Sequence, residues 1–301
     1  MTTVMDGGLA TELERRGYDL SNRLWSARVL LTEPDAIGDV HLAYFRAGAR
    51  VATTASYQAT VPGFAAAGLD RSTALAAIAR SVELARRARD VYAHESGVEP
   101  SDLLVAGSVG PYGAMLADGS EYRGDYDPGP AALREVHAPR IDALLAAGVD
   151  ILALETIPTT REAAVLLDLV EENGARAWLS YQCRDGSSTA AGEPFTDAVG
   201  LVSGRAMVAA VGVNCTAPRL VPALLAVATA ATDLPLMAYP NGGDRWDAAT
   251  RRWVATEVGG AYTGADVAGW AERGASWLGG CCGTTPNDIR ALAAALAARA
   301  A

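Results

Sequence analysis

Two kinds of hydrophobic pattern alternate along the chain. Short uninterrupted apolar runs are typical of strands buried on both faces, and apolar residues that recur every three to four positions are typical of amphipathic helices. The predicted strands are a first one ending at 4–5, then 50–54, 103–108, 150–154, 177–182, 208–213, 234–239 and 276–278. The predicted helices are 36–48, 72–93, 131–147, 161–173, 196–202, 217–230, 264–273 and 286–300. The pattern therefore predicts a succession of strand–helix units.

This succession predicts an α/β protein with a (β/α)8 TIM barrel formed by one domain, residues 1–301. An open doubly wound sheet is the alternative fold. It would need a glycine-rich dinucleotide fingerprint after the first strand, and Asp6-Gly7-Gly8-Leu9-Ala10 does not match it. No linker rich in Pro, Gly or Ser divides the chain, which favours the single barrel.

Three connections are longer than a barrel requires: residues 110–130, 183–195 and 241–263. Each follows a predicted strand, so each is expected at the carboxyl face of the barrel, where barrel enzymes build their active sites. Chemically active residues also stand at the predicted strand ends. They are Asp6, Gly7, Thr53, Thr54, Ser56, Glu155, Thr156, Asn214, Cys215, Asn241, Cys281 and Cys282.

Three of the four cysteines are in that group, namely Cys215 and the adjacent pair Cys281 and Cys282. Three thiolates that converge at strand ends would make a zinc site with one open position, whereas closed structural sites use four protein ligands. Cys183 lies in a different kind of segment and is expected to be a small buried apolar residue. The cysteines therefore predict an open, catalytic type of zinc site.

A zinc ion with three thiolate ligands is a weak activator of water but is suited to binding a substrate thiol. A free thiol has a pKa of about 8.5, and metal binding deprotonates it. The negative charge of such a site would attract a cationic electrophile such as a sulfonium methyl donor. Asp6 and Glu155 could hold the α-ammonium group of an amino-acid thiol, although an isolated carboxylate at a strand end is often only a helix cap.

Composition removes several other classes of function. The net charge is −10 and no run of basic residues is present, which disfavours nucleic-acid binding. All 25 basic residues are arginine, so lysine Schiff bases, pyridoxal phosphate chemistry and a P-loop are excluded. The three histidines, His41, His94 and His137, fall in predicted helices and are expected to be non-catalytic.

The scarcity of cysteine, with two of the four adjacent, argues against a disulfide framework and for a reducing compartment. No apolar run approaches the ~20 residues of a membrane span, and the first residues do not resemble a secretory signal. A soluble cytoplasmic protein without a membrane partner is expected.

Several segments together resemble the homocysteine S-methyltransferase family, and the resemblance covers essentially the whole chain. They are Met5-Asp6-Gly7-Gly8-Leu9-Ala10-Thr11-Glu12-Leu13, Leu24-Trp25-Ser26-Ala27, Thr54-Ala55-Ser56-Tyr57-Gln58-Ala59, Gly107-Ser108-Val109-Gly110-Pro111-Tyr112-Gly113, Gly212-Val213-Asn214-Cys215 and Gly279-Gly280-Cys281-Cys282. The run from Ala117 to Tyr126 is similar to the bacterial and plant branch that uses S-methylmethionine as methyl donor.

The resemblance implies a homocysteine-binding barrel that holds zinc and transfers a methyl group from a sulfonium donor to homocysteine, giving methionine. The implied zinc ligands are Cys215, Cys281 and Cys282, with the homocysteine sulfur as the fourth ligand. The implied substrate-binding residues are Asp6 and Glu155 for the ammonium group, Gly7 and Ser56 for the carboxylate, Asn214 beside the metal, and Trp25 in the donor pocket.

No protein nucleophile is implied. One departure is Gly283, where arginine is expected in close members of the family. S-adenosylmethionine remains an alternative donor, and the oligomeric state stays open. A zinc hydrolase with Glu155 as general base and a non-enzymatic metal-binding barrel are the alternative functions, and the latter would need a fourth protein ligand.

Overall fold

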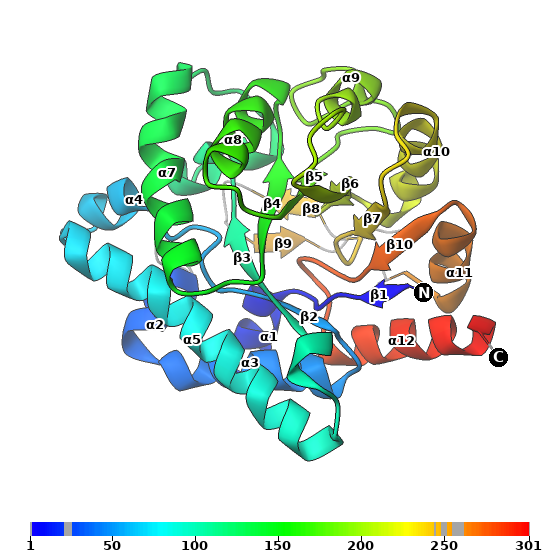
Figure 1. The fold of residues 1–301 in the computed structure, drawn as a ribbon, viewed down its shortest axis with the longest axis horizontal. Coiled ribbons are helices and arrows are strands. Elements are labelled where there is room, and N and C mark those ends of the chain that lie inside the picture. The colour runs from blue at the N-terminus through cyan, green and yellow to red at the C-terminus, as the bar shows by residue number, and fades with distance from the viewer. Residues whose placement is uncertain (1, 21–25, 244, 248–251, 255–261, 301) are drawn as a thin grey trace.

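The computed structural model describes residues 2–20, 26–243, 245–247, 252–254 and 262–300. Eight parallel strands surround a common axis, with helices on the outside (Figure 1). They are β1 (Thr3–Val4), β2 (Val51–Thr53), β3 (Leu104–Val109), β4 (Ile151–Ile157), β5 (Ala177–Tyr181), β6 (Val208–Asn214), β7 (Leu236–Tyr239) and β10 (Ala275–Leu278). Their order is β1-β10-β7-β6-β5-β4-β3-β2. The predicted barrel is confirmed.

Each predicted helix is present after its strand. They are α3 (Pro34–Arg46), α5 (Arg71–Ser96), α7 (Pro130–Ala146), α8 (Thr160–Glu172), α9 (Phe195–Gly200), α10 (Val221–Ala231), α11 (Gly264–Glu272) and α12 (Pro286–Ala300). The boundaries differ most before α10, because the short 3-10 helix η3 (Pro218–Leu220) precedes it. Among the described helices, none is long and apolar enough to cross a lipid bilayer.

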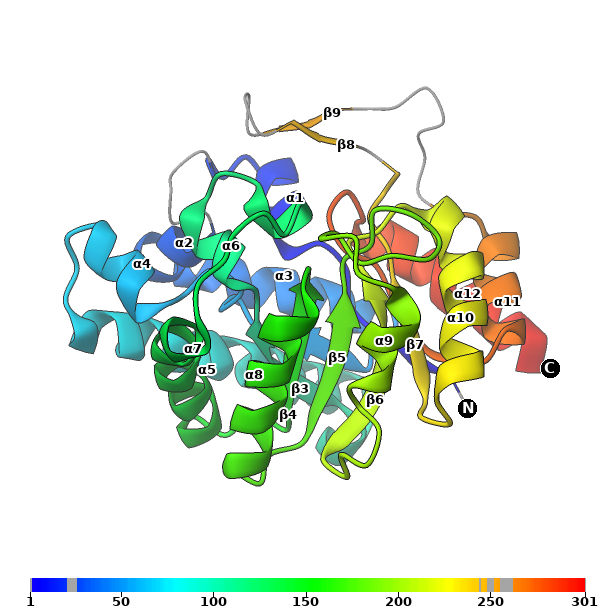
Figure 2. The same cartoon turned by 90° about the horizontal axis from the view of Figure 1, so that it is seen from above.

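Sequence periodicity missed the short elements between these units. They are α1 (Leu9–Arg15), α2 (Ser26–Thr32), α4 (Val61–Ala66), α6 (Tyr112–Leu116), η1 (Pro100–Asp102), η2 (Ser120–Tyr122) and the hairpin strands β8 (Arg245–Asp247) and β9 (Arg252–Val254). Helices of five to seven residues have too few turns for a periodic pattern and depend on tertiary packing. In Figure 2 the antiparallel β8–β9 hairpin lies beyond the carboxyl ends of the barrel strands.

Apolar side chains pack in two layers, as a parallel sheet covered by helices requires. The outer layer lies between strands and helices and includes Leu152, Leu154 and Leu166. The inner layer fills the barrel axis and includes Trp178, Met237 and Ile151. This inner core fills the barrel axis below its carboxyl face, where the predicted site residues stand.

β1 and β2 are the first and last strands in the sheet order, and individual hydrogen bonds join them at the seam of the barrel. The Arg50 amide donates to the Val4 carbonyl at 2.7 Å. Above it, the Asp6 carboxylate accepts hydrogen bonds from the Thr53 amide at 2.6 Å and the Thr53 hydroxyl at 2.9 Å. A side chain predicted to bind substrate therefore also joins the two edges of the barrel.

Candidate active site

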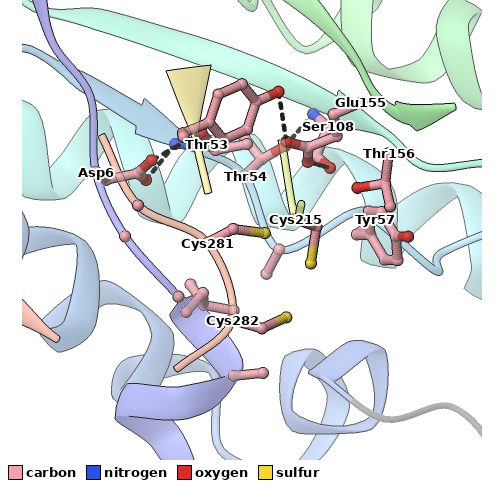
Figure 3. Close-up of a pocket in the computed structure, with 17 residues that line it drawn as sticks. Asp6, Thr53, Thr54, Tyr57, Ser108, Glu155, Thr156, Cys215, Cys281 and Cys282 are labelled. Carbon is pink, nitrogen blue, oxygen red and sulfur yellow. Dashed lines mark hydrogen bonds between the residues drawn. The ribbon is translucent and has the colours of Figure 1, made fainter. Parts of the chain in front are cut away.

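A pocket opens at the carboxyl face of the barrel, and its wall is built from strand ends (Figure 3). The predicted site residues Asp6, Gly7, Glu155, Cys215, Cys281 and Cys282 all line it. The other lining residues are Gly8, Leu9, Ala10, Thr53, Thr54, Ala55, Tyr57, Ser108, Thr156, Tyr239 and Gly280. Residues separated by more than 270 positions thus face one space because the strands are parallel and their carboxyl ends meet.

The three cysteines form a compact cluster. Cys215 follows β6, Cys281 and Cys282 follow β10, and all three sulfur atoms lie within 4.8 Å of one another. A tetrahedral zinc with Zn–S bonds of about 2.3 Å would hold its sulfurs roughly 3.8 Å apart, so small side-chain adjustments suffice. In the described part of the chain, no fourth His, Cys, Asp or Glu joins the group. The cluster can therefore hold a metal with a position left for a ligand.

The protonation of the cluster is set by hydrogen bonds between its thiols. Hydrogen bonds donated by Cys215 and Cys281 lower the pKa of Cys282 well below its ordinary value, and Tyr122 also donates to this sulfur. The pKa of Cys215 is raised because its proton is held by Cys281 and Cys282. The hydrogen bonds thus favour the thiolate form at Cys282, the form in which a cysteine binds a metal.

Two buried carboxylates face the same pocket. Burial raises the pKa of Asp6 to about 8, and the negative charge of Glu155 adds to the rise. Burial likewise raises the pKa of Glu155 to about 8, with a further contribution from Cys281. Glu155 accepts hydrogen bonds from the Ser108 hydroxyl and, at 3.3 Å, from Tyr239. Because a nearby positive charge favours the ionised form of both acids, this end of the pocket is suited to a cation.

Asn214, at the end of β6, connects the cluster to Thr156 on β4, the next strand but one in the sheet. Its side-chain oxygen accepts from the Thr156 amide and its nitrogen donates to the Thr156 hydroxyl, both at 2.7 Å. The same nitrogen lies 3.9 Å from the Cys281 sulfur. Thr156 and Cys215 have positive φ angles of 60° and 47°, an uncommon conformation for residues other than glycine. Asn214 therefore supports the metal-binding wall rather than the pocket surface, which it does not line.

The sequence as a whole matches the family model for homocysteine S-methyltransferase over residues 3–296. The chain belongs to the homocysteine S-methyltransferase family. It is 49% identical over 292 residues to homocysteine S-methyltransferase of Escherichia coli strain K12, covering 97% of this chain and 94% of the relative. It is 43% identical over 294 residues to homocysteine S-methyltransferase YbgG of Bacillus subtilis strain 168, covering 97% and 93%.

A solved structure of the family has the same fold. The metallated form of the homocysteine methyltransferase MmuM from Escherichia coli aligns with a TM-score of 0.87 at 47% identity, covering 97% of this chain and 96% of that chain. The (β/α)8 architecture is therefore common to both proteins, and this chain is a methyltransferase by its family.

Other predicted residues are not brought into the pocket. Ser56 is buried, and its hydroxyl donates to the Ser108 carbonyl at 2.8 Å instead of facing the opening, so the structure does not place it against a substrate carboxylate. Trp25 lies outside the described residues. Cys183 is buried apart from the cluster, where it pairs with Thr189 in an isolated β-bridge.

Gly283 stands where the family resemblance led us to expect arginine. Gly283 has a φ of 79°, in the left-handed region that glycine adopts without strain, and its amide donates to the Thr11 hydroxyl at 2.8 Å. The residue directly after the cysteine pair thus turns the chain toward α12 and leaves the three sulfurs in place.

Tyr57 and Tyr239 line the pocket but were not singled out as site residues from the sequence. Tyr57 directly follows Ser56, the last of the polar residues after β2. This position was the signal available in the sequence. Its main chain is held by a buried arginine: Arg140 donates to the Tyr57 carbonyl at 2.8 Å and to the Gly110 carbonyl at 2.6 Å. Arg140 therefore joins the connections that follow β2 and β3.

The arginine belongs to a buried chain of polar groups. Its guanidinium lies 2.7 Å from His137 Nδ1, and His137 Nε2 lies 2.7 Å from the Glu162 carboxylate. Glu162 also accepts from the Tyr112 amide at 2.6 Å and from the Tyr126 hydroxyl at 2.5 Å. The long connection between β3 and α7 is thus fixed on either side of η2. His137 is buried in this chain of hydrogen bonds and does not line the pocket.

Proposed function

We propose that this protein transfers a methyl group from a sulfonium amino acid, S-methylmethionine in the first instance, to the sulfur of homocysteine, forming methionine. The observation that carries the proposal is the meeting of three cysteines with two buried carboxylates in one pocket. A metal centre that accepts a substrate thiolate needs the cysteines, and the ammonium group of an amino acid needs the carboxylates. Membership of the homocysteine S-methyltransferase family supports the acceptor.

Asp6 and Glu155 would receive the α-ammonium group of homocysteine. Both are more than nine-tenths buried, so a cation that binds between them replaces solvent as the partner of their charges. Asp6 is held by Thr53 and Glu155 by Ser108, so both carboxylates are oriented before the substrate arrives. Gly7, which also lines the pocket, offers main-chain groups near the substrate carboxylate.

Cys215, Cys281 and Cys282 would hold zinc, and their sulfur atoms fit thiolate ligation. When bound, zinc supplies a Lewis acid that keeps the homocysteine sulfur deprotonated at neutral pH. Asn214 would keep the Cys281 side of the cluster in place through its contact with that sulfur. S-adenosylmethionine is the alternative donor, because it has the same sulfonium centre.

The transfer itself requires no protein nucleophile. The homocysteine thiolate forms a bond to the methyl carbon while the bond from that carbon to the donor sulfur breaks, and the electron pair stays on the donor sulfur. The positive charge of the sulfonium is thereby cancelled. The protein contributes orientation of the two substrates and a pocket of matching charge.

The decisive experiment measures methionine formation by zinc-loaded protein with homocysteine, offering S-methylmethionine, S-adenosylmethionine and betaine separately. We expect turnover with a sulfonium donor that is lost on chelation and restored by zinc. Absence of methionine with every donor, despite one zinc per chain, would contradict the proposal. Selenocysteine should be included as an acceptor, because a relative from Brassica oleracea var. italica, 41% identical over 309 residues, is named selenocysteine Se-methyltransferase.

A further inference from the structure

Glu121 on η2 is a buried carboxylate that the proposed reaction has not used. Its side chain is only 6% exposed, and its Oε2 atom has no hydrogen-bond partner among the described residues. The other buried acids among the described residues all accept hydrogen bonds. Glu162 accepts from Tyr112 and Tyr126, and Glu12 accepts from Arg15 and Arg16. Asp6 and Glu155 accept the hydrogen bonds given above.

An unpaired buried carboxylate is costly, because the ionised form loses its solvation without gaining a partner. Burial accordingly raises the pKa of Glu121 to about 7, despite a hydrogen bond from its own amide. A second buried acceptor, in the connection after β2, is also without a donor: Gln58 is 9% exposed, its Oε1 is unpartnered, and its Nε2 donates to the Ala114 carbonyl at 2.9 Å. A buried carboxylate oxygen without a donor is a candidate to accept a hydrogen bond from a ligand.

Glu121 is adjacent in sequence to Tyr122, which contacts the cysteine cluster. η2 packs against β4 and against α6, whose Ala114 carbonyl accepts a hydrogen bond from the Gln58 side chain. The adjacent Tyr122 donates a hydrogen bond to Cys282, and the charge of Glu121 acts on both Cys282 and Tyr57. Glu155, in contrast, acts on and responds to Cys281. Glu155 lines the pocket, whereas Glu121 is not one of its lining residues and lies behind the wall that Tyr57 contributes.

The segment that carries Glu121 is also held firmly. Tyr112 and Tyr126, on either side of η2 in sequence, both donate to the buried Glu162. Glu162 is connected through His137 to Arg140, which donates a hydrogen bond to the Tyr57 carbonyl. Orientation of this kind would serve little purpose for a carboxylate without a ligand.

We propose that Glu121 binds the α-ammonium group of the amino-acid methyl donor. The inference rests on the proposed function, in which two amino acids must be bound at once and Asp6 with Glu155 serve only the acceptor. An ammonium group has three N–H donors, and Glu121 Oε2 can accept one of them. Because the carboxylate is buried, the donor head group must displace part of the wall that contains Tyr57 and Tyr122.

The test compares Glu121→Gln with wild type in steady-state kinetics on two sulfonium donors. One is S-methylmethionine, and the other is dimethylsulfoniopropionate, which has no ammonium group. Loss of one charge-assisted hydrogen bond should raise the KM for S-methylmethionine about 10- to 100-fold. The KM for homocysteine and the zinc content should not change, and on dimethylsulfoniopropionate the variant should match wild type. Glu135→Gln, an exposed position on α7 with the same change of charge, is the control.

Equal kinetics of wild type and Glu121→Gln on S-methylmethionine would overturn the proposal, and so would an equal loss on both donors, which would indicate a structural role. If the variant does not fold, titration calorimetry on the wild-type protein tests the proposal instead. S-methylmethionine should then bind at least tenfold more tightly than its N-acetyl derivative, and equal affinities would overturn the subsite. Donor binding without methionine formation would contradict the proposed reaction while leaving the subsite standing.

Discussion

Asn214 and Thr156 hold each other by two hydrogen bonds of 2.7 Å across the ends of β6 and β4. Thr156 and Cys215, the residue after Asn214, both have left-handed backbone conformations. Such conformations cost about 1–3 kcal/mol each and persist only where the surroundings enforce them. The pair therefore stabilises the backbone that aims Cys215 into the pocket.

Replacing Asn214 by alanine should weaken both stability and metal binding. The Thr156 amide would be left buried without a partner, at a cost of about 1–3 kcal/mol, and Cys215 would lose the support of its turn. We expect a lower midpoint in urea unfolding and weaker zinc affinity in a competitive chelator titration. Asn173→Ala, after α8 and away from the pocket, is the matched control. Unchanged zinc affinity in Asn214→Ala would show that the turn forms without this side chain.

Asp6 should contribute to both substrate binding and closure of the barrel. Asp6→Asn removes the negative charge and also one of the two acceptor contacts to Thr53. We expect a rise in the KM for homocysteine of about tenfold or more, together with a loss of roughly 1 kcal/mol in the free energy of unfolding. Thr53→Val removes only the hydroxyl contact and should affect stability more than KM. Equal effects of both variants on KM would remove the direct role of Asp6 in ammonium binding.

Cys281→Ala should abolish metal binding and turnover together, whereas Cys183→Ala should retain both. The reason is that Cys281 shares the three-sulfur cluster and Cys183 lies outside it. Zinc content by atomic absorption and methionine formation by chromatography measure the two properties on the same samples. Full turnover by Cys281→Ala would eliminate the proposed mechanism.

His41 should make the protein less stable in acid. This residue on α3 is fully buried, its two ring nitrogens have no hydrogen-bond partner among the described residues, and burial lowers its pKa to about 4. The pKa of histidine in the unfolded chain is about 6.5, so the unfolded chain binds the proton before the folded protein does as the pH is lowered. Stability is therefore highest above pH 6.5 and falls as pH decreases toward 4. The loss attributable to His41 is about 3 kcal/mol.

His41→Leu should therefore flatten the dependence of unfolding free energy on pH between 6.5 and 4, as measured by urea denaturation at a series of pH values. His137, whose pKa burial also lowers, will keep part of the slope. His94→Gln, on the exposed side of α5, serves as control. An identical slope in wild type and His41→Leu would mean that His41 gains a partner or solvent when it is protonated.

The chemistry of the cysteines and the barrel could be predicted from the sequence for one reason. Both depend on local patterns repeated along the chain: apolar runs that predict strands, and reactive residues placed where each run ends. Parallel strands in a closed sheet bring those ends together whatever the separation in sequence. Cys215 and Cys281 are 66 positions apart in number, and no side-chain detail was needed to expect them in one site.

The tertiary structure alone decided how the side chains at the mouth are used. Ser56 was expected to face a substrate, but its hydroxyl donates a hydrogen bond to the Ser108 carbonyl of the neighbouring strand. Asp6 became a closing contact of the barrel because Thr53 lies across the seam. The buried chain from Arg140 to Glu162 and the unpartnered Glu121 likewise depend on contacts between distant segments. Local sequence determines which groups reach the mouth, whereas hydrogen-bond partners brought together by folding determine which of them remain available to a substrate.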